Sequence, residues 1–241
     1  MRNSNRNKRV YLLLLFALIV FGGFYLYRTL LPPGPILDPV PNLVSDKATL
    51  SKAFDESDIS TNPLKNLYFG DLHVHTALSF DAFIGGATSM PESAYRFAKG
   101  EEVEVYGNPV KIKRPLDFAA VTDHAEFIGE LYSIQTPGAP AYRSIMARYF
   151  RAVGTDTIKQ RDLFNRVSGR MGDGQRNHLP IFQGFETTKN AWNVILEAAE
   201  FHYRPGQFTT FAAYEWSLSG LRPNGRLGAH YHRNIIFKDV E

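Results

Sequence analysis

The sequence contains no cysteine among its 241 residues. Without thiols the chain can form no disulfide, no thiolate metal site and no cysteine nucleophile, and this absence is compatible with any cellular compartment. Internal repeats and low-complexity tracts are also missing, which excludes a repeat architecture. With a hydrophobic content of 44%, a chain of this length is expected to fold as one main globular body.

The main body of the chain also lacks a strong net charge of either sign. The formal net charge is +3 at pH 7, and removing the five positive charges in or beside the apolar N-terminal segment leaves −2 for the rest. No stripe of basic residues with interleaved aromatic residues occurs in that remainder, so nucleic acid is not expected as a partner. The five basic residues are Arg2, Arg6, Lys8, Arg9 and Arg28.

The N-terminal segment carries one long uncharged apolar run, VYLLLLFALIVFGGFYLY, at residues 10–27. With basic residues before it, this run predicts a transmembrane signal anchor over 10–28, preceded by a cytoplasmic segment over 1–9. The charge bias places the main body outside the cytoplasm. A cleaved signal peptide is the alternative. Five prolines in residues 31–42 predict an extended linker over 29–42, followed by the main domain over 43–241.

The main domain alternates between strand-like and helix-like periods. Buried strands are expected at 66–72, 116–122, 208–216 and 233–238, with a hairpin at 103–113 and mostly helical structure over 138–206. This alternation predicts an α/β fold, either a barrel or an open sheet, with polar groups gathered at the strand ends.

The stretch GDLHVHTALSFDAF, residues 70–83, places two histidines at alternate positions of a predicted strand. Alternate residues share a face, so the imidazoles of His73 and His75 can converge on one metal ion. A pair of hydrogen-bonded core histidines is the alternative. Other strand ends repeat the pattern of imidazole and carboxylate groups, which without sulfur suit zinc, manganese or iron and are too many for one tetrahedral ion. These groups are Asp81, Asp123, His124, Glu215, His230 and His232.

Four segments, GDLHVHTALSFD, LDFAAVTDHAEFIG, FTTFAAYEWS and HYHRNIIF, resemble in order the motifs of the polymerase and histidinol phosphatase (PHP) superfamily. The resemblance covers about residues 66–238 and is nearest to a branch of exported bacterial proteins. It implies a distorted (β/α)7 barrel with up to three metal ions that serves phosphoester hydrolysis. With the N-terminal anchor, it places the protein in the bacterial inner membrane as a single-pass protein whose main domain faces the periplasm or the extracellular side.

The resemblance also implies roles for individual residues. The metal ligands would be His73, His75, Asp81, His124, His232 and Glu215, with Glu215 bridging two ions. Asp123 would lie behind a ligand and fix an imidazole tautomer. His230 is expected to support the ligands, with a surface or loop role as the alternative. Glu126 would be a supporting or substrate-facing group. Apart from the resemblance, the positive charges of Arg222, Arg226 and Arg233 could bind an anionic substrate or serve only solubility.

The superfamily pattern continues with a further histidine and an Asp-x-His motif, which are not present before Glu241. The barrel and site are therefore expected to be incomplete in this chain, which is expected to be a fragment of a longer gene product. A genuinely shortened protein is the alternative.

The predicted function is a membrane-anchored, metal-dependent hydrolase of the phosphoesterase type, which uses two or three divalent ions and a metal-activated water on a small-molecule phosphoester. No protein nucleophile is assigned. A non-catalytic binding module or relic of the same fold is the first alternative, and a metal-dependent amidohydrolase is the second. The sequence does not indicate the oligomeric state.

Overall fold

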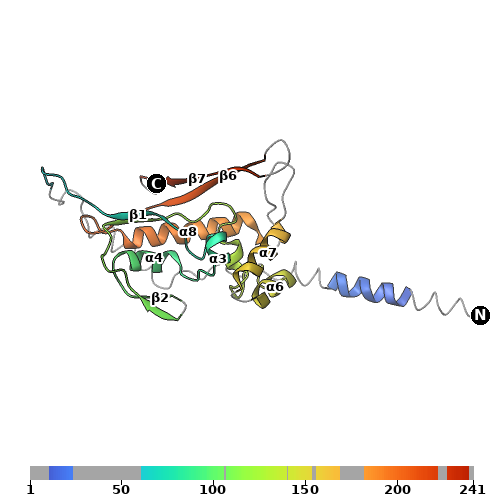
Figure 1. Ribbon diagram of the computed structural model, residues 1–241. Helices are drawn as coiled ribbons and strands as arrows, with labels where there is room; N and C mark the ends of the chain where they lie inside the picture. Colours follow the sequence, from blue (N-terminus) through green and yellow to red (C-terminus); the bar gives the residue numbers. More distant parts are fainter. Residues whose placement is uncertain are drawn as a thin grey trace, which may run out of the picture. The chain divides into compact units, whose positions relative to one another are not determined.

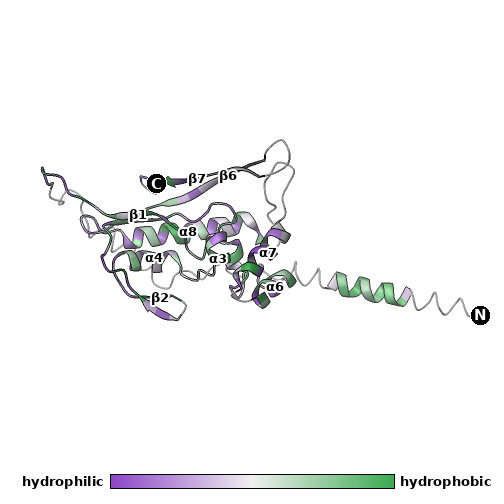
Figure 2. Ribbon diagram, viewed as in Figure 1, coloured by the Kyte–Doolittle hydropathy of each residue, from purple (hydrophilic) through white to green (hydrophobic). Residues whose placement is uncertain are grey.

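The computed structural model describes residues 11–23, 61–105, 107–139, 141–153, 156–168, 182–221 and 227–238. The chain divides into two compact units, Met1–Gly34 and Pro35–Glu241. In the first unit, residues 11–23 form a helix whose residues are nearly all exposed. Figure 2 shows this helix as hydrophobic over most of its length.

The prediction of a transmembrane helix over residues 10–28 is wrong for the part of the chain that the structure describes. Within the described parts of the chain, no helix is long and apolar enough to cross a membrane. The part of the N-terminal helix that the structure describes, residues 11–23, is shorter than the roughly 20 residues that the hydrocarbon core of a bilayer requires. The predicted cytoplasmic segment 1–9 and the predicted linker 29–42 lie outside the described residues.

A small parallel sheet forms the centre of the second unit. Its strands are β1 (Gly70–Val74), β4 (Phe118–Val121) and β5 (Thr209–Phe211), in the order β1-β4-β5. All pairings are parallel, and the register between β1 and β4 shifts between Asp71 and Val74. His73 lies within this irregular stretch, and His75 directly follows the last residue of β1.

Two helices cover one side of this sheet. Helix α4 (Pro91–Ala98) and helix α8 (Gly184–His202) pack on each other and on β4 and β5, and Figure 1 shows them on the same side of β1. Proline at the first turn of α4 suits a position whose N–H has no partner within the helix. Apolar residues from both helices and β4 form the main core, which includes Tyr95, Ala119, Val121, Ile195 and Ala198.

A second apolar cluster joins the shorter helices. These are α3 (Phe80–Ile84), α5 (Glu130–Ser133), α6 (Ile145–Val153) and α7 (Thr157–Ser168). Their contacts centre on buried side chains that include Phe83, Leu131, Ile134, Phe150 and Phe182. This cluster anchors α3, the helix that follows the histidine strand and carries Asp81.

Two antiparallel hairpins complete the unit. Strands β2 (Val103–Val105) and β3 (Asn108–Val110) form the predicted short hairpin, with Gly107 at a positive φ of 75° in its turn. Strands β6 (Ala213–Leu221) and β7 (Leu227–Ile236) form a longer one. The single strand predicted over 208–216 is therefore two strands, β5 and the start of β6, separated at Ala212.

The predicted distorted (β/α)7 barrel, complete or incomplete, is wrong. The described strands form a three-stranded sheet and two separate two-stranded sheets, and none of these closes into a barrel. The physical reason lies in β6 and β7, which pair antiparallel with each other instead of extending the parallel sheet through a helical crossover. The fold is a mixed α/β arrangement of small sheets.

One buried histidine lies in the main core. His202, the last residue of α8, is 2% exposed, and neither of its ring nitrogens makes a hydrogen bond with a described residue. Its ring packs against Tyr95 and Phe201 at centroid distances of 5.6 and 5.1 Å. Burial, helped by nearby Lys99, lowers the pKa of His202 to about 4, because water no longer solvates the charged form.

We therefore expect His202 to make the fold sensitive to acid. The unfolded chain binds a proton at this residue below a pKa of about 6.5, whereas the folded chain does so only near 4, so stability falls as the pH falls through this window. The contribution amounts to about 2 kcal/mol between pH 7 and pH 5. His202→Phe keeps an aromatic ring and removes the titration. Urea unfolding at both pH values should show a smaller loss of stability for His202→Phe than for the wild type, and equal losses would contradict the assignment.

Candidate metal centre

The first part of the site is the end of β1. His73 Nε2 and His75 Nε2 both lie 2.8 Å from the same carboxylate oxygen, Glu215 Oε2. The side chain of Asp71 accepts the His73 backbone N–H at 2.9 Å, which supports the irregular turn of the strand. The two imidazoles predicted to converge do lie together, with ring centroids 5.0 Å apart.

The second part is the junction between the parallel sheet and the β6–β7 hairpin. His124 and Glu215 form an isolated parallel bridge, in which Glu215 N donates to Asp123 O at 3.0 Å and Ala125 N donates to Glu215 O at 2.8 Å. This pairing places the Glu215 carboxylate, 1% exposed, among imidazoles from the ends of β1 and β4 and from the middle of β7. Glu215 Oε1 is 3.7 Å from His124 Nδ1 and in direct contact with His232 Nδ1.

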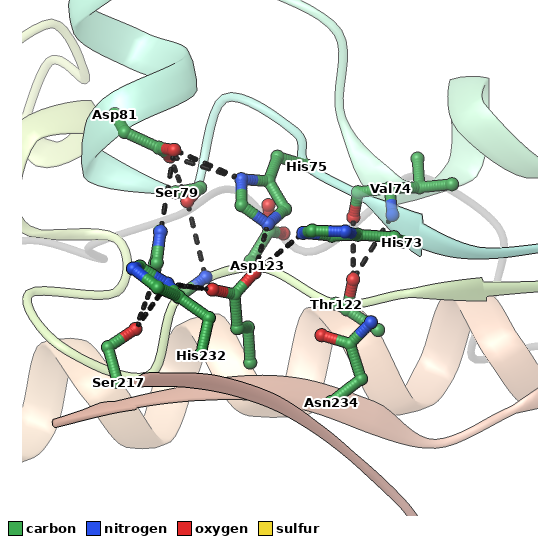
Figure 3. Close-up of polar contacts among 12 residues, drawn as sticks. His73, Val74, His75, Ser79, Asp81, Thr122, Asp123, Ser217, His232 and Asn234 are labelled. Carbon is green, nitrogen blue, oxygen red and sulfur yellow. Dashed lines mark hydrogen bonds and ion pairs between the residues drawn. The ribbon is translucent and has the colours of Figure 1, made fainter. Parts of the chain in front are cut away.

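The third part is Asp81 at the start of α3. Its carboxylate lies 3.2 Å from His75 Nδ1 and 3.4 Å from His124 Nε2, so it faces the ring nitrogens that point away from Glu215. The Ser79 hydroxyl donates to Asp81 and also accepts the His124 backbone N–H at 3.2 Å. Ser79 thus ties α3 to the end of β4 (Figure 3).

These residues form three groups that could hold a metal ion. In each group the offered ligand atoms lie within 4.8 Å of one another. Nitrogen and carboxylate oxygen donors without sulfur are the set expected for zinc, manganese or iron. The groups are His73, His75 and Glu215; His75, Asp81 and His124; and His124, Glu215 and His232.

Charge interactions in the cluster favour the charged forms of both kinds of residue: they raise the pKa of His124 and lower that of Glu215. Burial opposes the charged form of His124, but the carboxylates of Asp81, Glu126 and Glu215 outweigh it and raise its pKa to about 9. Burial likewise disfavours ionised Glu215, yet the surrounding imidazoles lower its pKa. An ion that binds here must displace protons from imidazoles, so affinity for a metal rises with pH.

Asp123 and Glu126 lie beside the cluster with partners of their own. Asp123 is fully buried and accepts hydrogen bonds from the Thr76 backbone N–H and, at 2.6 Å, from the Thr76 hydroxyl. Its side chain therefore joins β1 to β4 and does not bond an imidazole. Burial raises the pKa of Asp123 to about 6 although the Thr76 bonds lower it. Glu126 Oε1 accepts the Ser217 N–H at 3.0 Å, and Oε2 lies 3.7 Å from His124 Nδ1.

Among the residues that it describes, the structure does not bring the remaining predicted site residues into the cluster. Arg233 pairs with Trp216 in the hairpin, one step from the pair of Ser217 with His232. Neighbouring pairs face opposite sides of an antiparallel ribbon, so Arg233 points away from the cluster. His230 pairs with Ser219 in the backbone register, and its side chain lies outside the described part. Arg222 and Arg226 also lie outside it.

Two residues of the site escaped the sequence prediction. The Ser217 hydroxyl lies 2.8 Å from His124 Nδ1 and 3.1 Å from His232 Nδ1. Asn234 Nδ2 donates to Leu72 O at 2.7 Å and links the hairpin to β1. The signal for Ser217 was its position two residues after Glu215, on the same face of one strand.

An apolar pocket of about 270 Å³ lies behind the cluster and is distinct from it. Tyr214 lines this pocket, and because it precedes Glu215 on β6, it faces the opposite side of the strand. The pocket lining contains none of the candidate ligands: it consists of Ala125, Ile128, Thr188, Trp192, Tyr214 and Phe237.

The fold and site together define a mixed α/β protein with a cluster of histidine and carboxylate side chains that could hold a metal ion. The chain belongs to the DUF3604 family of proteins of unknown function, whose sequence model matches residues 62–241. All the candidate ligands lie within this stretch. No curated protein and no solved structure matches the chain.

The Asp123–Thr76 contact predicts a stability effect at the base of the site. Asp123→Ala leaves the buried Thr76 N–H without its acceptor, which should lower the free energy of unfolding by about 2–3 kcal/mol. Asp123→Asn retains an acceptor oxygen and should cost less. Asp117→Ala is the matched control, because Asp117 accepts the Phe69 N–H at 2.7 Å from a half-buried position. Urea unfolding would contradict the prediction if both alanine variants lost the same small amount.

Proposed function

We propose that this protein is a metal-dependent hydrolase that acts on a small-molecule phosphoester. The observation that carries the proposal is the environment of Glu215. This buried carboxylate faces imidazoles with both of its oxygens, and the imidazoles come from β1, from the end of β4 and from β7. The order of the histidine and carboxylate motifs, which resembles that of the PHP superfamily, supports the same reading.

The orientations of the imidazole rings favour two ions, each held by one group of three ligands. A neutral imidazole has one nitrogen free to ligate, so His75 and His124 can each serve one ion. The groups His73–His75–Glu215 and His124–Glu215–His232 can be filled together, because they use different nitrogens and share Glu215 through its two oxygens. In that arrangement Asp81 accepts the remaining N–H groups of His75 and His124, the usual role of a carboxylate behind a ligating histidine.

Divalent ions bound in such a cluster make hydroxide available near neutral pH and stabilise negative charge on phosphoryl oxygens. The role of the protein is to hold the ligand side chains in fixed positions. The bridge between His124 and Glu215 holds two ligands at a fixed separation, and Asp81 fixes the tautomers of two rings. His73 and His232 are the more exposed members, with side chains 61% and 44% exposed, so a substrate would approach from their side.

Two other functions use the same cluster. A non-catalytic binding module would hold the ions without hydrolysis, and a metal-dependent amidohydrolase would direct the same chemistry at a carbonyl carbon. The motif order favours the phosphoesterase over the amidohydrolase, and turnover of a phosphoester distinguishes the phosphoesterase from the binding module.

The metal content tests the centre directly. We expect the full chain, purified without chelator, to contain at least one equivalent of zinc, manganese or iron by plasma mass spectrometry. Glu215→Gln keeps the shape of the side chain but removes the charge shared by two ligand groups. The affinity of this variant for the metal ion should therefore fall by more than the roughly 10–100-fold that is typical when a group behind a ligand is lost. Glu104→Gln, on the exposed surface of β2, is the control. Folded wild-type protein free of metal after incubation with each ion would refute the centre.

Hydrolysis is tested by comparing substrate classes. We expect the metal-loaded chain to hydrolyse mono- or bis-(4-nitrophenyl) phosphate, and chelation or Glu215→Gln should abolish the activity. Release of nitrophenol from 4-nitrophenyl acetate, or of nitroaniline from an anilide, with no phosphoester turnover would favour the amidohydrolase. Metal binding without turnover of either class would favour the binding module.

A further inference from the structure

Ser217 occupies a position among the candidate ligands that no sequence motif assigned. Its hydroxyl oxygen lies 2.8 Å from His124 Nδ1 and 3.1 Å from His232 Nδ1. These are the nitrogens of the two rings that face Glu215 Oε1. Figure 3 shows Ser217 and His232 together on the hairpin, opposite His75 and Asp81. The hydroxyl is therefore next to the atoms that would hold an ion in this group.

The distances suit direct coordination. Ligand atoms around a tetrahedral zinc with Zn–N bonds of about 2.0–2.1 Å lie about 3.3 Å apart. The Ser217 oxygen is slightly closer than this to both imidazole nitrogens, so a small outward shift would place it at a fourth corner. The group His124–Glu215–His232 has three protein ligands, which leaves that corner open.

The backbone holds Ser217 in this position. Its N–H donates to Glu126 Oε1 at 3.0 Å, and residue 217 is paired with His232 in the β6–β7 register. The hydroxyl now has hydrogen-bond contacts with two imidazole nitrogens. When those nitrogens give their lone pairs to an ion, neither can exchange a hydrogen bond with the hydroxyl, so its oxygen is released toward the same ion.

We propose that Ser217 is the fourth protein ligand, through its hydroxyl oxygen, of the ion held by His124, Glu215 and His232. This inference rests on the metal centre of the proposed function. It changes that group from three protein ligands to four. It also gives Glu126 a role, since Glu126 holds the backbone of the added ligand.

The absence of cysteine from the chain makes a specific test possible. Ser217→Cys would introduce the only thiol, and a thiolate bound to cobalt(II) gives a sulfur-to-metal charge-transfer band in the near ultraviolet. We expect titration of the full-length Ser217→Cys chain with Co²⁺ to produce this band at one equivalent per introduced cysteine. Ser93→Cys is the control and should give no band, because the Ser93 hydroxyl contacts Glu92 on α4 and no imidazole.

The outcomes separate this inference from the proposed function. Wild-type protein that binds no Co²⁺ by plasma mass spectrometry would overturn the metal centre itself. Ser217→Cys that binds Co²⁺ with wild-type stoichiometry but without the band would overturn only the assignment of Ser217. If Ser217→Cys does not fold, as judged by circular dichroism, Ser217→Ala decides: a changed visible cobalt spectrum supports the ligand role, and an unchanged spectrum and affinity refute it.

Discussion

The site depends on one short backbone pairing between the end of β4 and β6. Glu215 N to Asp123 O and Ala125 N to Glu215 O, at 3.0 and 2.8 Å, join a parallel sheet to an antiparallel hairpin. Because β7 is paired with β6 along most of its length, this junction also determines where His232 and Ser217 lie. Ligands that are far apart in the sequence thus come together through a few hydrogen bonds, and the rest of the fold serves to hold β1 and β4 in register beneath them.

The negative charge of Glu215 at this junction requires a positively charged partner. A carboxylate as buried as Glu215 is unfavourable unless it is paired, and the surrounding imidazoles can supply that charge only when protonated. Their carboxylate neighbours favour the protonated form, as the raised pKa of His124 shows. A divalent ion provides the same compensation with neutral imidazoles. The cluster can therefore be satisfied by protons or by cations, and pH and metal concentration decide between them.

Much of the site could be predicted from strand periodicity alone. His73 and His75 alternate at the end of β1, with His75 directly after its last residue, and the structure brings them to one carboxylate oxygen. Glu215 and Ser217 alternate in the same way, although only the first was recognised. Arg233 shows the limit of this approach. The strand was expected to begin at residue 233, but β7 spans Leu227–Ile236. Arg233 therefore follows His232 within one strand and faces the opposite side.

The fold was harder to predict than the site because a barrel depends on the pairing of all its strands, whereas the site depends on a few contacts. Closing a barrel requires every strand to find a partner on both sides, whereas gathering these ligands requires only the ends of β1, β4 and the β6–β7 hairpin to be adjacent. Segment 208–216 reads as one apolar strand, yet β5 ends at Phe211 and β6 begins at Ala213, so the chain leaves the parallel sheet and enters the hairpin. That break removes the expected architecture and at the same time directs Glu215 toward His73, His75 and His124. The chemistry proposed for the cluster therefore rests on the local junction and does not require a barrel.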